Sequence, residues 1–263
     1  MSSSVFANIE RSGQNESIRY TIVPSTGQPE TGTLSSSGDN PRWPSATAGV
    51  STSEALISAV VGGDGTAWTI RTWRTQATPI SWQMADELAP PGTRYARPAV
   101  AASDDLLVVF EHWHGSGSSL LFSRASASPP QLEFDDPASL SDGHGLSWRE
   151  HSLPAVALNA SNQGLAAWIG RRDDDRYCLL ASGYDDNNSF LATSDPTHAI
   201  TIDMLPPHVK VEQLYVRING TTAYVHLTEH KDTQLVTHEW PLSLPTGAPA
   251  GPRQTVIHNG ANQ

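Results

Sequence analysis

A short phrase that recurs along the chain is the feature that most restricts its fold. It reads Arg97-Pro98-Ala99-Val100-Ala101-Ala102, and it returns as Leu153-Pro154-Ala155-Val156-Ala157-Leu158. Weaker versions surround Trp43-Pro44-Ser45 and Pro207-His208-Val209. The copies are roughly fifty residues apart, which is the period of propeller blades and related repeats. The phrase therefore predicts that one small β-unit is repeated around a common axis.

The apolar residues follow a strand pattern and not a helical one. Short β-rich runs such as Leu106 to Trp113 and Ala223 to Leu227 are separated by turn signals such as Asn219-Gly220. This is the pattern of many short antiparallel strands. We predict an all-β protein, with residues 1–263 forming a single β-propeller domain of five four-stranded blades. A four-bladed propeller and a two-sheet sandwich are the alternatives.

The two ends of the chain suggest how the ring of blades closes. The second strands of the units begin near Val5, Ala55, Leu106, Gly164 and Ala223, which makes five units. The first unit has no obvious opening strand, and the chain ends in an extra strand from Arg253 to His258. In a propeller, strands from the two termini can share one blade and so remove an open edge. We predict that the ring closes in this way.

Charge and composition exclude several classes of partner. The net charge is −11, which disfavours nucleic acid and anionic membranes. The sequence has no apolar run of about eighteen residues, and its first residues lack the basic and apolar regions of a signal peptide. The single cysteine, Cys178, suits a reducing compartment. We expect a cytoplasmic protein that binds neither nucleic acid nor membrane.

Two segments resemble the blades of a known family. Ser12-Gly13-Gln14-Asn15-Glu16-Ser17-Ile18-Arg19-Tyr20 is followed by Gly38-Asp39-Asn40-Pro41-Arg42-Trp43. This pair is similar to a blade of the fungal fucose-binding lectins, and Leu244 to Gly251 resembles the tail of that family. The resemblance implies a propeller with sugar pockets between neighbouring blades. In each pocket an Arg and a Glu would bind sugar hydroxyls, and an aromatic ring would cover the apolar face of the sugar.

The resemblance indicates particular ligand-binding residues. Arg19 matches the family's arginine, Arg71 matches it next best, and Trp43 matches the tryptophan of the turn. The third and fifth units depart from the pattern, because Leu120-Leu121-Phe122 and Gln234-Leu235-Val236 stand where the arginine should be. No blade shows the Arg and the Glu at the family's spacing.

Tryptophan is frequent, with eight residues in the chain. Its ring stacks on sugar C–H faces and its N–H remains available as a donor. Trp73, Trp113 and Trp240 lie beside charged or histidine residues, and we predict that they contact a ligand.

The most conspicuous polar cluster is Glu111-His112-Trp113-His114. His112 and His114 are two residues apart on a strand and would point to the same face. A zinc site needs at least a third protein ligand, so we expect no metal. If the end of the last blade, with His226, meets this cluster at one mouth of the ring, then Glu111, His112, His114 and His226 are the candidate catalytic residues.

These observations lead to two functional hypotheses. The first is a lectin-like carbohydrate-binding protein with pockets between its blades. The second is an enzyme of secondary metabolism, a cofactor-independent cyclase or pericyclase-type catalyst with one deep pocket; a glycoside hydrolase ranks below it. Both predict a glycan or small-molecule ligand and no cofactor, and both leave a homodimer open.

Overall fold

The structure is a computed structural model that describes residues 4–12, 15–24, 27–34, 40–49, 54–62, 68–76, 82–88, 94–114, 117–126, 133–140, 148–185, 189–194, 199–207 and 209–258. In these ranges the regular structure is β-strand, apart from the single helical turn α1 (Leu191–Ser194). The predicted all-β fold is confirmed.

The strands form five antiparallel sheets, and each sheet is a meander of consecutive strands. The first sheet contains β1 (Ser4–Ser12), β2 (Asn15–Val23) and β3 (Glu30–Thr33). The second contains β4 (Arg42–Ala48), β5 (Glu54–Val61), β6 (Thr69–Gln76) and β7 (Gln83–Glu87). The third contains β8 (Arg94–Ala102), β9 (Asp105–His114), β10 (Gly117–Ser126) and β11 (Ala138–Ser139).

The last two sheets have the same strand order. The fourth contains β12 (Trp148–Leu158), β13 (Gly164–Arg172), β14 (Tyr177–Tyr184) and β15 (Ile200–Leu205). The fifth contains β16 (Lys210–Asn219), β17 (Thr222–Lys231), β18 (Gln234–Ser243) and β19 (Gln254–His258). Five consecutive meanders are the blades of a five-bladed propeller, as the repeat predicted.

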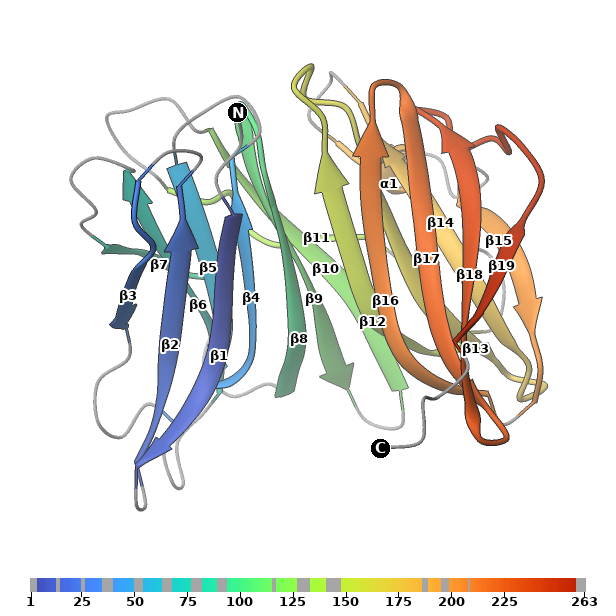
Figure 1. Cartoon of the computed structure of the whole chain (residues 1–263). Helices are drawn as coiled ribbons and strands as arrows, with labels where there is room; N and C mark the ends of the chain where they lie inside the picture. Colours follow the sequence, from blue (N-terminus) through green and yellow to red (C-terminus); the bar gives the residue numbers. More distant parts are fainter. Residues whose placement is uncertain are drawn as a thin grey trace.

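Neighbouring blades are held together by buried apolar side chains. The first strands of the blades lie side by side in chain order, with β1 against β4, β4 against β8, β8 against β12 and β12 against β16 (Figure 1). Each of these four interfaces contains its own cluster of buried residues, represented by the pairs Ile18 and Ile57, Leu56 and Phe110, Val109 and Trp168, and Leu179 and Val225. The core is therefore divided into layers between blades.

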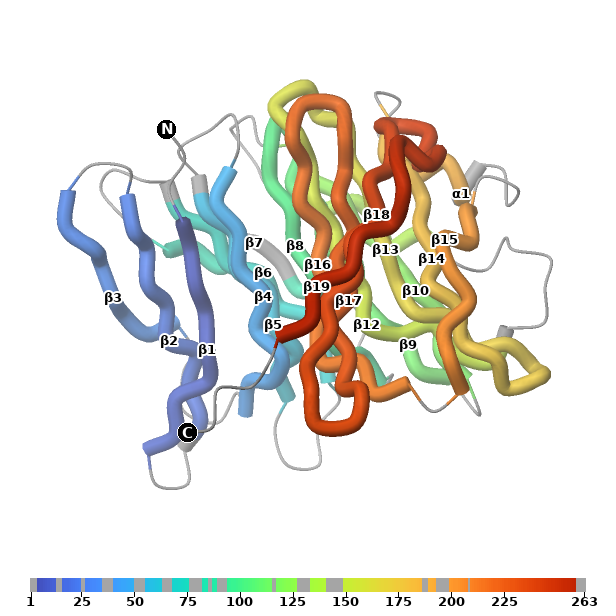
Figure 2. The backbone as a smooth tube through the Cα atoms, turned by 45° about the vertical axis from the view of Figure 1, so that its right-hand side comes forward, coloured from blue at the N-terminus to red at the C-terminus, as the bar shows by residue number. Residues whose placement is uncertain are grey.

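The predicted sharing of one blade by the two chain ends is wrong. The C-terminal strand β19 pairs with β18, from Leu235 opposite His258 to Glu239 opposite Gln254. It thereby completes the fifth blade, whereas the described part of the first blade contains β1, β2 and β3. Figure 1 shows the first blade at the left and the last blade at the right, and Figure 2 shows β19 beside β18 in the last blade. The pairing of β19 with β18 satisfies the backbone groups along one edge of β19 and places the strand in the fifth blade.

The recurring phrase forms the same β-bulge in three blades. Trp43, Arg97 and Leu153 each precede a proline, and each has a positive φ, of 47°, 45° and 53°. The strand register shifts at the same three places, as expected for a β-bulge. The proline cannot donate to the ladder, and the bulge accommodates that loss. The bulges line a central cavity of about 460 Å³ together with residues of β16.

Candidate ligand-binding site

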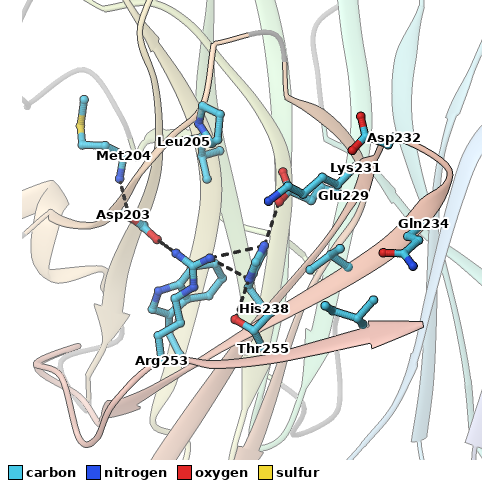
Figure 3. A pocket seen from close by; sticks show the side chains of 14 residues that line it. Asp203, Met204, Leu205, Glu229, Lys231, Asp232, Gln234, His238, Arg253 and Thr255 are labelled. Atoms are coloured by element: carbon cyan, nitrogen blue, oxygen red, sulfur yellow. Dashed lines mark hydrogen bonds and ion pairs between the residues drawn. The ribbon is translucent and has the colours of Figure 1, made fainter. Parts of the chain in front are cut away.

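A pocket with several hydrogen-bonded polar side chains lies between the fourth and fifth blades. It has a volume of about 420 Å³ and is lined by the end of β15, by β17 and β18, and by Arg253 with the following strand β19. Figure 3 shows Asp203, Glu229, His238 and Arg253 joined by dashed contacts across this pocket. These four side chains come from four different segments, so tertiary structure alone brings them together.

The four polar groups form one continuous chain of hydrogen bonds. Arg253 Nη1 lies 2.7 Å from Asp203 Oδ2, and Arg253 Nη2 lies 2.8 Å from His238 Nδ1. His238 Nε2 lies 2.9 Å from Glu229 Oε1. Because a guanidinium only donates, His238 Nδ1 must accept, and we infer that Nε2–H donates to Glu229. The imidazole thus lies between an arginine and a carboxylate.

An aromatic ring forms part of the same pocket. Trp240 is two residues beyond His238 on β18, so both side chains point to the same face of the sheet. The Arg253 guanidinium lies 5.3 Å from the centre of the Trp240 ring, in cation–π contact. The predicted role of Trp240 in ligand binding stays a prediction, and the residue is buried, with 7% of its surface exposed.

Sequence reasoning missed Arg253, His238 and Asp203. The alternation His238, Glu239, Trp240 was the available signal, because it places a histidine and a tryptophan on one face of a strand. Arg253 precedes a strand that had been assigned to another blade, so its partners were not predictable. Asp203 is close to Arg253 only because the fourth and fifth blades pack together.

Glu111 is fully buried and serves as a hydrogen-bond hub. Its carboxylate accepts from Leu153 N at 2.8 Å, from Trp113 Nε1 at 3.0 Å and from Arg97 Nη1 at 3.1 Å. The contact with Leu153 crosses from the third blade to the fourth. These partners occupy the carboxylate, and its predicted catalytic role stays a prediction.

The candidate histidines lie on the third and fifth blades, and their convergence on one site stays a prediction. His112 and His114 lie on β9 of the third blade, and the His112 ring stacks on Tyr95 with centres 5.3 Å apart. His226 lies on β17 of the fifth blade, stacked on Tyr215 with centres 4.3 Å apart. Within the described ranges no three histidine, cysteine or acidic side chains are placed to hold a metal ion.

The remaining predicted contacts are spread over the first two blades. Arg19 pairs with Glu10 at 2.8 Å, and Arg71 pairs with Glu87 at 2.8 Å. Trp73 is buried in the core between these blades and has 6% of its surface exposed. A ligand at either arginine would have to displace or join an exposed carboxylate, so both residues stay predicted contacts.

His226 provides a test of the structure through pH. Burial lowers its pKa from the usual 6.5, and the nearby Glu239 carboxylate opposes this change. The unfolded chain therefore takes up the proton at a higher pH than the folded chain. The contribution of His226 to stability is fully present above pH 6.5, and it declines as the pH falls through the pKa of His226 in the folded state.

We expect His226→Gln to reduce this loss of stability in acid. The measurement is the melting temperature of both proteins at about pH 7.5 and about pH 5.5, with the two drops compared. A smaller drop in the variant is the expected result. Equal drops would mean that His226 titrates alike in the folded and unfolded chain.

Comparison with known proteins bears on the fold. No sequence-family profile matches the chain, and no curated protein sequence matches it. Among solved structures, a Trypanosoma rangeli sialidase in complex with the inhibitor DANA is similar with a TM-score of 0.58 and 10% identity. The match covers 93% of this chain and 42% of the sialidase.

Two further structures are similar over most of the chain. A B. megaterium levansucrase mutant has a TM-score of 0.51 and 10% identity, with 83% of this chain and 70% of that one covered. The Aleuria aurantia lectin, in complex with alpha-methyl-L-fucoside, has a TM-score of 0.49 and 11% identity, with 97% and 78% covered. At these identities the likeness concerns the fold. The fold of this chain is a β-propeller. Among the described residues, no helix is long and apolar enough to cross a membrane.

Proposed function

We propose that this propeller binds carbohydrate through the pocket between its fourth and fifth blades, in the manner of a lectin. The observation that carries the proposal is the convergence of Arg253, His238 and Glu229 on one cavity that also contains the Trp240 ring. Charged donors and acceptors beside an aromatic ring are suited to sugar hydroxyls and to the C–H face of a sugar.

The geometry supports binding in a further way. The chain of hydrogen bonds from Asp203 to Glu229 fixes the orientation of Arg253 and His238 before a ligand arrives. Preorganised groups lose less conformational entropy on binding. The solved structures with this fold include a lectin in complex with a fucoside, and a sialidase and a levansucrase, which agrees with a sugar ligand.

We expect Arg253→Gln to weaken glycan binding by about tenfold or more, because a charge-assisted hydrogen bond contributes about 1.5–3 kcal/mol. The measurement is a screen of the purified protein on an array of neutral glycans, followed by titration of the best ligand. The screen also includes Arg19→Gln and Arg71→Gln, which test the contacts implied by the lectin resemblance.

Arg217→Gln is the matched control. Arg217 pairs with Glu239 and lies on the same sheet, on β16, outside this pocket. If Arg217→Gln binds the glycan as tightly as the wild type and Arg253→Gln does not, the sugar lies in the pocket. Binding that is unchanged in Arg253→Gln, or a blank array with folded protein, would contradict the proposal.

A cofactor-independent cyclase or pericyclase-type enzyme is the second candidate. It is favoured by the central cavity of about 460 Å³, whose lining combines Trp43, Arg97, Leu153 and Tyr215 from four blades. A single site on the axis differs from the repeated pockets expected of a lectin. Turnover of a hydrophobic biosynthetic intermediate that is lost in Arg97→Gln would support this candidate.

A further inference from the structure

A second pocket lies between the second and third blades. It has a volume of about 360 Å³, and seven described residues line it: Arg42, Trp43, Trp68, Arg94, Tyr95, Ala96 and Trp113. They come from the starts of β4 and β8, the end of β9 and the residue before β6. The lining thus combines four aromatic rings with two guanidinium groups, and none of the seven residues is acidic.

The two arginines are the unusual part of this pocket. The Arg42 guanidinium lies 5.2 Å from the centre of the Trp68 ring. In the part of the chain that the structure describes, neither Arg42 nor Arg94 forms an ion pair with an acidic side chain. The chain as a whole has 27 acidic and 16 basic residues, so two arginines without an acidic partner stand out. Planar guanidinium groups are well suited to carboxylate and sulfate oxygens.

The rings beside these arginines are presented to solvent. Trp43 is 45% exposed and Trp113 is 36% exposed. Trp113 already donates its indole N–H to Glu111, so it offers a ligand the face or edge of its ring. Trp43 is held at a positive φ of 47° at the bulge before Pro44, which is a costly backbone conformation for a bulky residue. The same bulge recurs at Arg97 and Leu153, so this conformation fixes the position of the Trp43 ring and is not specific to this pocket.

We propose that this pocket binds an anionic ligand that combines a carboxylate or sulfate with a flat or apolar body. Arg42 and Arg94 would hold the oxyanion, and Trp43 and Trp113 would stack on the body of the ligand. The site is separate from the pocket between the fourth and fifth blades and does not depend on it. Acidic sugars and aromatic acids both have this chemistry, and the experiment separates them.

The experiment titrates the full chain with two matched pairs of probes. The first pair is a glucuronate oligosaccharide and a glucose oligosaccharide of the same length; the second is indole-3-acetate and indole-3-acetamide. Binding is measured by calorimetry and by tryptophan fluorescence. We expect at least one anionic probe to bind about tenfold or more tightly than its neutral counterpart, and the difference to shrink as salt is added.

The variant Arg42→Gln/Arg94→Gln should remove the preference for the anionic probe. Arg11→Gln is the control, since Arg11 forms an exposed ion pair with Glu16 in the β1–β2 hairpin. Arg253→Gln should leave this preference unchanged, which separates this result from that of the carbohydrate proposal. Three results would overturn the proposal. They are equal binding of anionic and neutral probes, binding of no anionic probe, and a preference for the anionic probe that survives in the folded double variant.

Discussion

Replacing Glu111 by alanine should lower the free energy of unfolding by about 3 kcal/mol or more. The carboxylate is fully buried and accepts hydrogen bonds from Leu153 N, Trp113 Nε1 and Arg97. The variant leaves the backbone N–H of Leu153 without its acceptor and opens a cavity between the third and fourth blades. Chemical denaturation monitored by tryptophan fluorescence measures the loss.

Two further variants make this expectation specific. Glu111→Gln retains the volume and one carbonyl acceptor, so its loss should be smaller than that of alanine. Glu10→Ala removes a carboxylate whose side chain is 44% exposed and paired with Arg19, and it should cost less than about 1 kcal/mol. If Glu111→Ala were as stable as Glu10→Ala, the hub would contribute nothing to the packing of the blades.

A similar loss, of about 3–5 kcal/mol, is expected for Asp105→Ala. Asp105 is 5% exposed and lies at the start of β9. It accepts from Tyr184 Oη at 2.7 Å, from Asn162 Nδ2 at 2.7 Å and from Arg124 Nη1 at 3.1 Å. Tyr184 and Asn162 belong to the fourth blade and Asp105 to the third. Without the carboxylate, the fully buried Tyr184 hydroxyl loses its acceptor and the Arg124 guanidinium loses its contact with Asp105.

A double-mutant cycle tests this interpretation. Burial and the contact with Asp105 raise the pKa of Tyr184, so its hydroxyl is protonated. The hydroxyl donates a hydrogen bond to Asp105. Tyr184→Phe removes that hydroxyl, and the double variant Asp105→Ala/Tyr184→Phe should lose less stability than the sum of the single variants. Strict additivity of the two losses would show that the hydroxyl and the carboxylate do not depend on each other.

The fold was largely predictable because repetition and alternation are local properties. The copies of the phrase at 97–102 and 153–158 do lie in the first strands of the third and fourth blades, and the turn signal at 219–220 does lie between strands. The pairing of β19 was predicted wrongly, because a short strand of five residues satisfies its hydrogen bonds equally well on either neighbouring edge. Only the packing of the complete fifth blade decides between the two edges.

The candidate sites were predictable only in part. Trp43 was indicated by the lectin resemblance and Trp113 by the residues beside it, and both line one pocket of the structure. Arg253 and His238 carried no local signal of pairing, because His238 lies on β18 and Arg253 lies in the segment that precedes β19. Arg19 and Arg71 matched a sequence pattern, yet their described partners are exposed carboxylates.

The amino-acid sequence by itself determined the class of fold and the number of blades, because strand alternation and the repeated phrase can be recognised along the chain. The tertiary structure alone decided which side chains share a pocket. Asp203 meets Arg253, and Leu153 meets Glu111, across interfaces between blades. The physical reason is that each blade buries its apolar faces against its neighbours, and the resulting register between blades is set by the packing of many side chains and by no short motif.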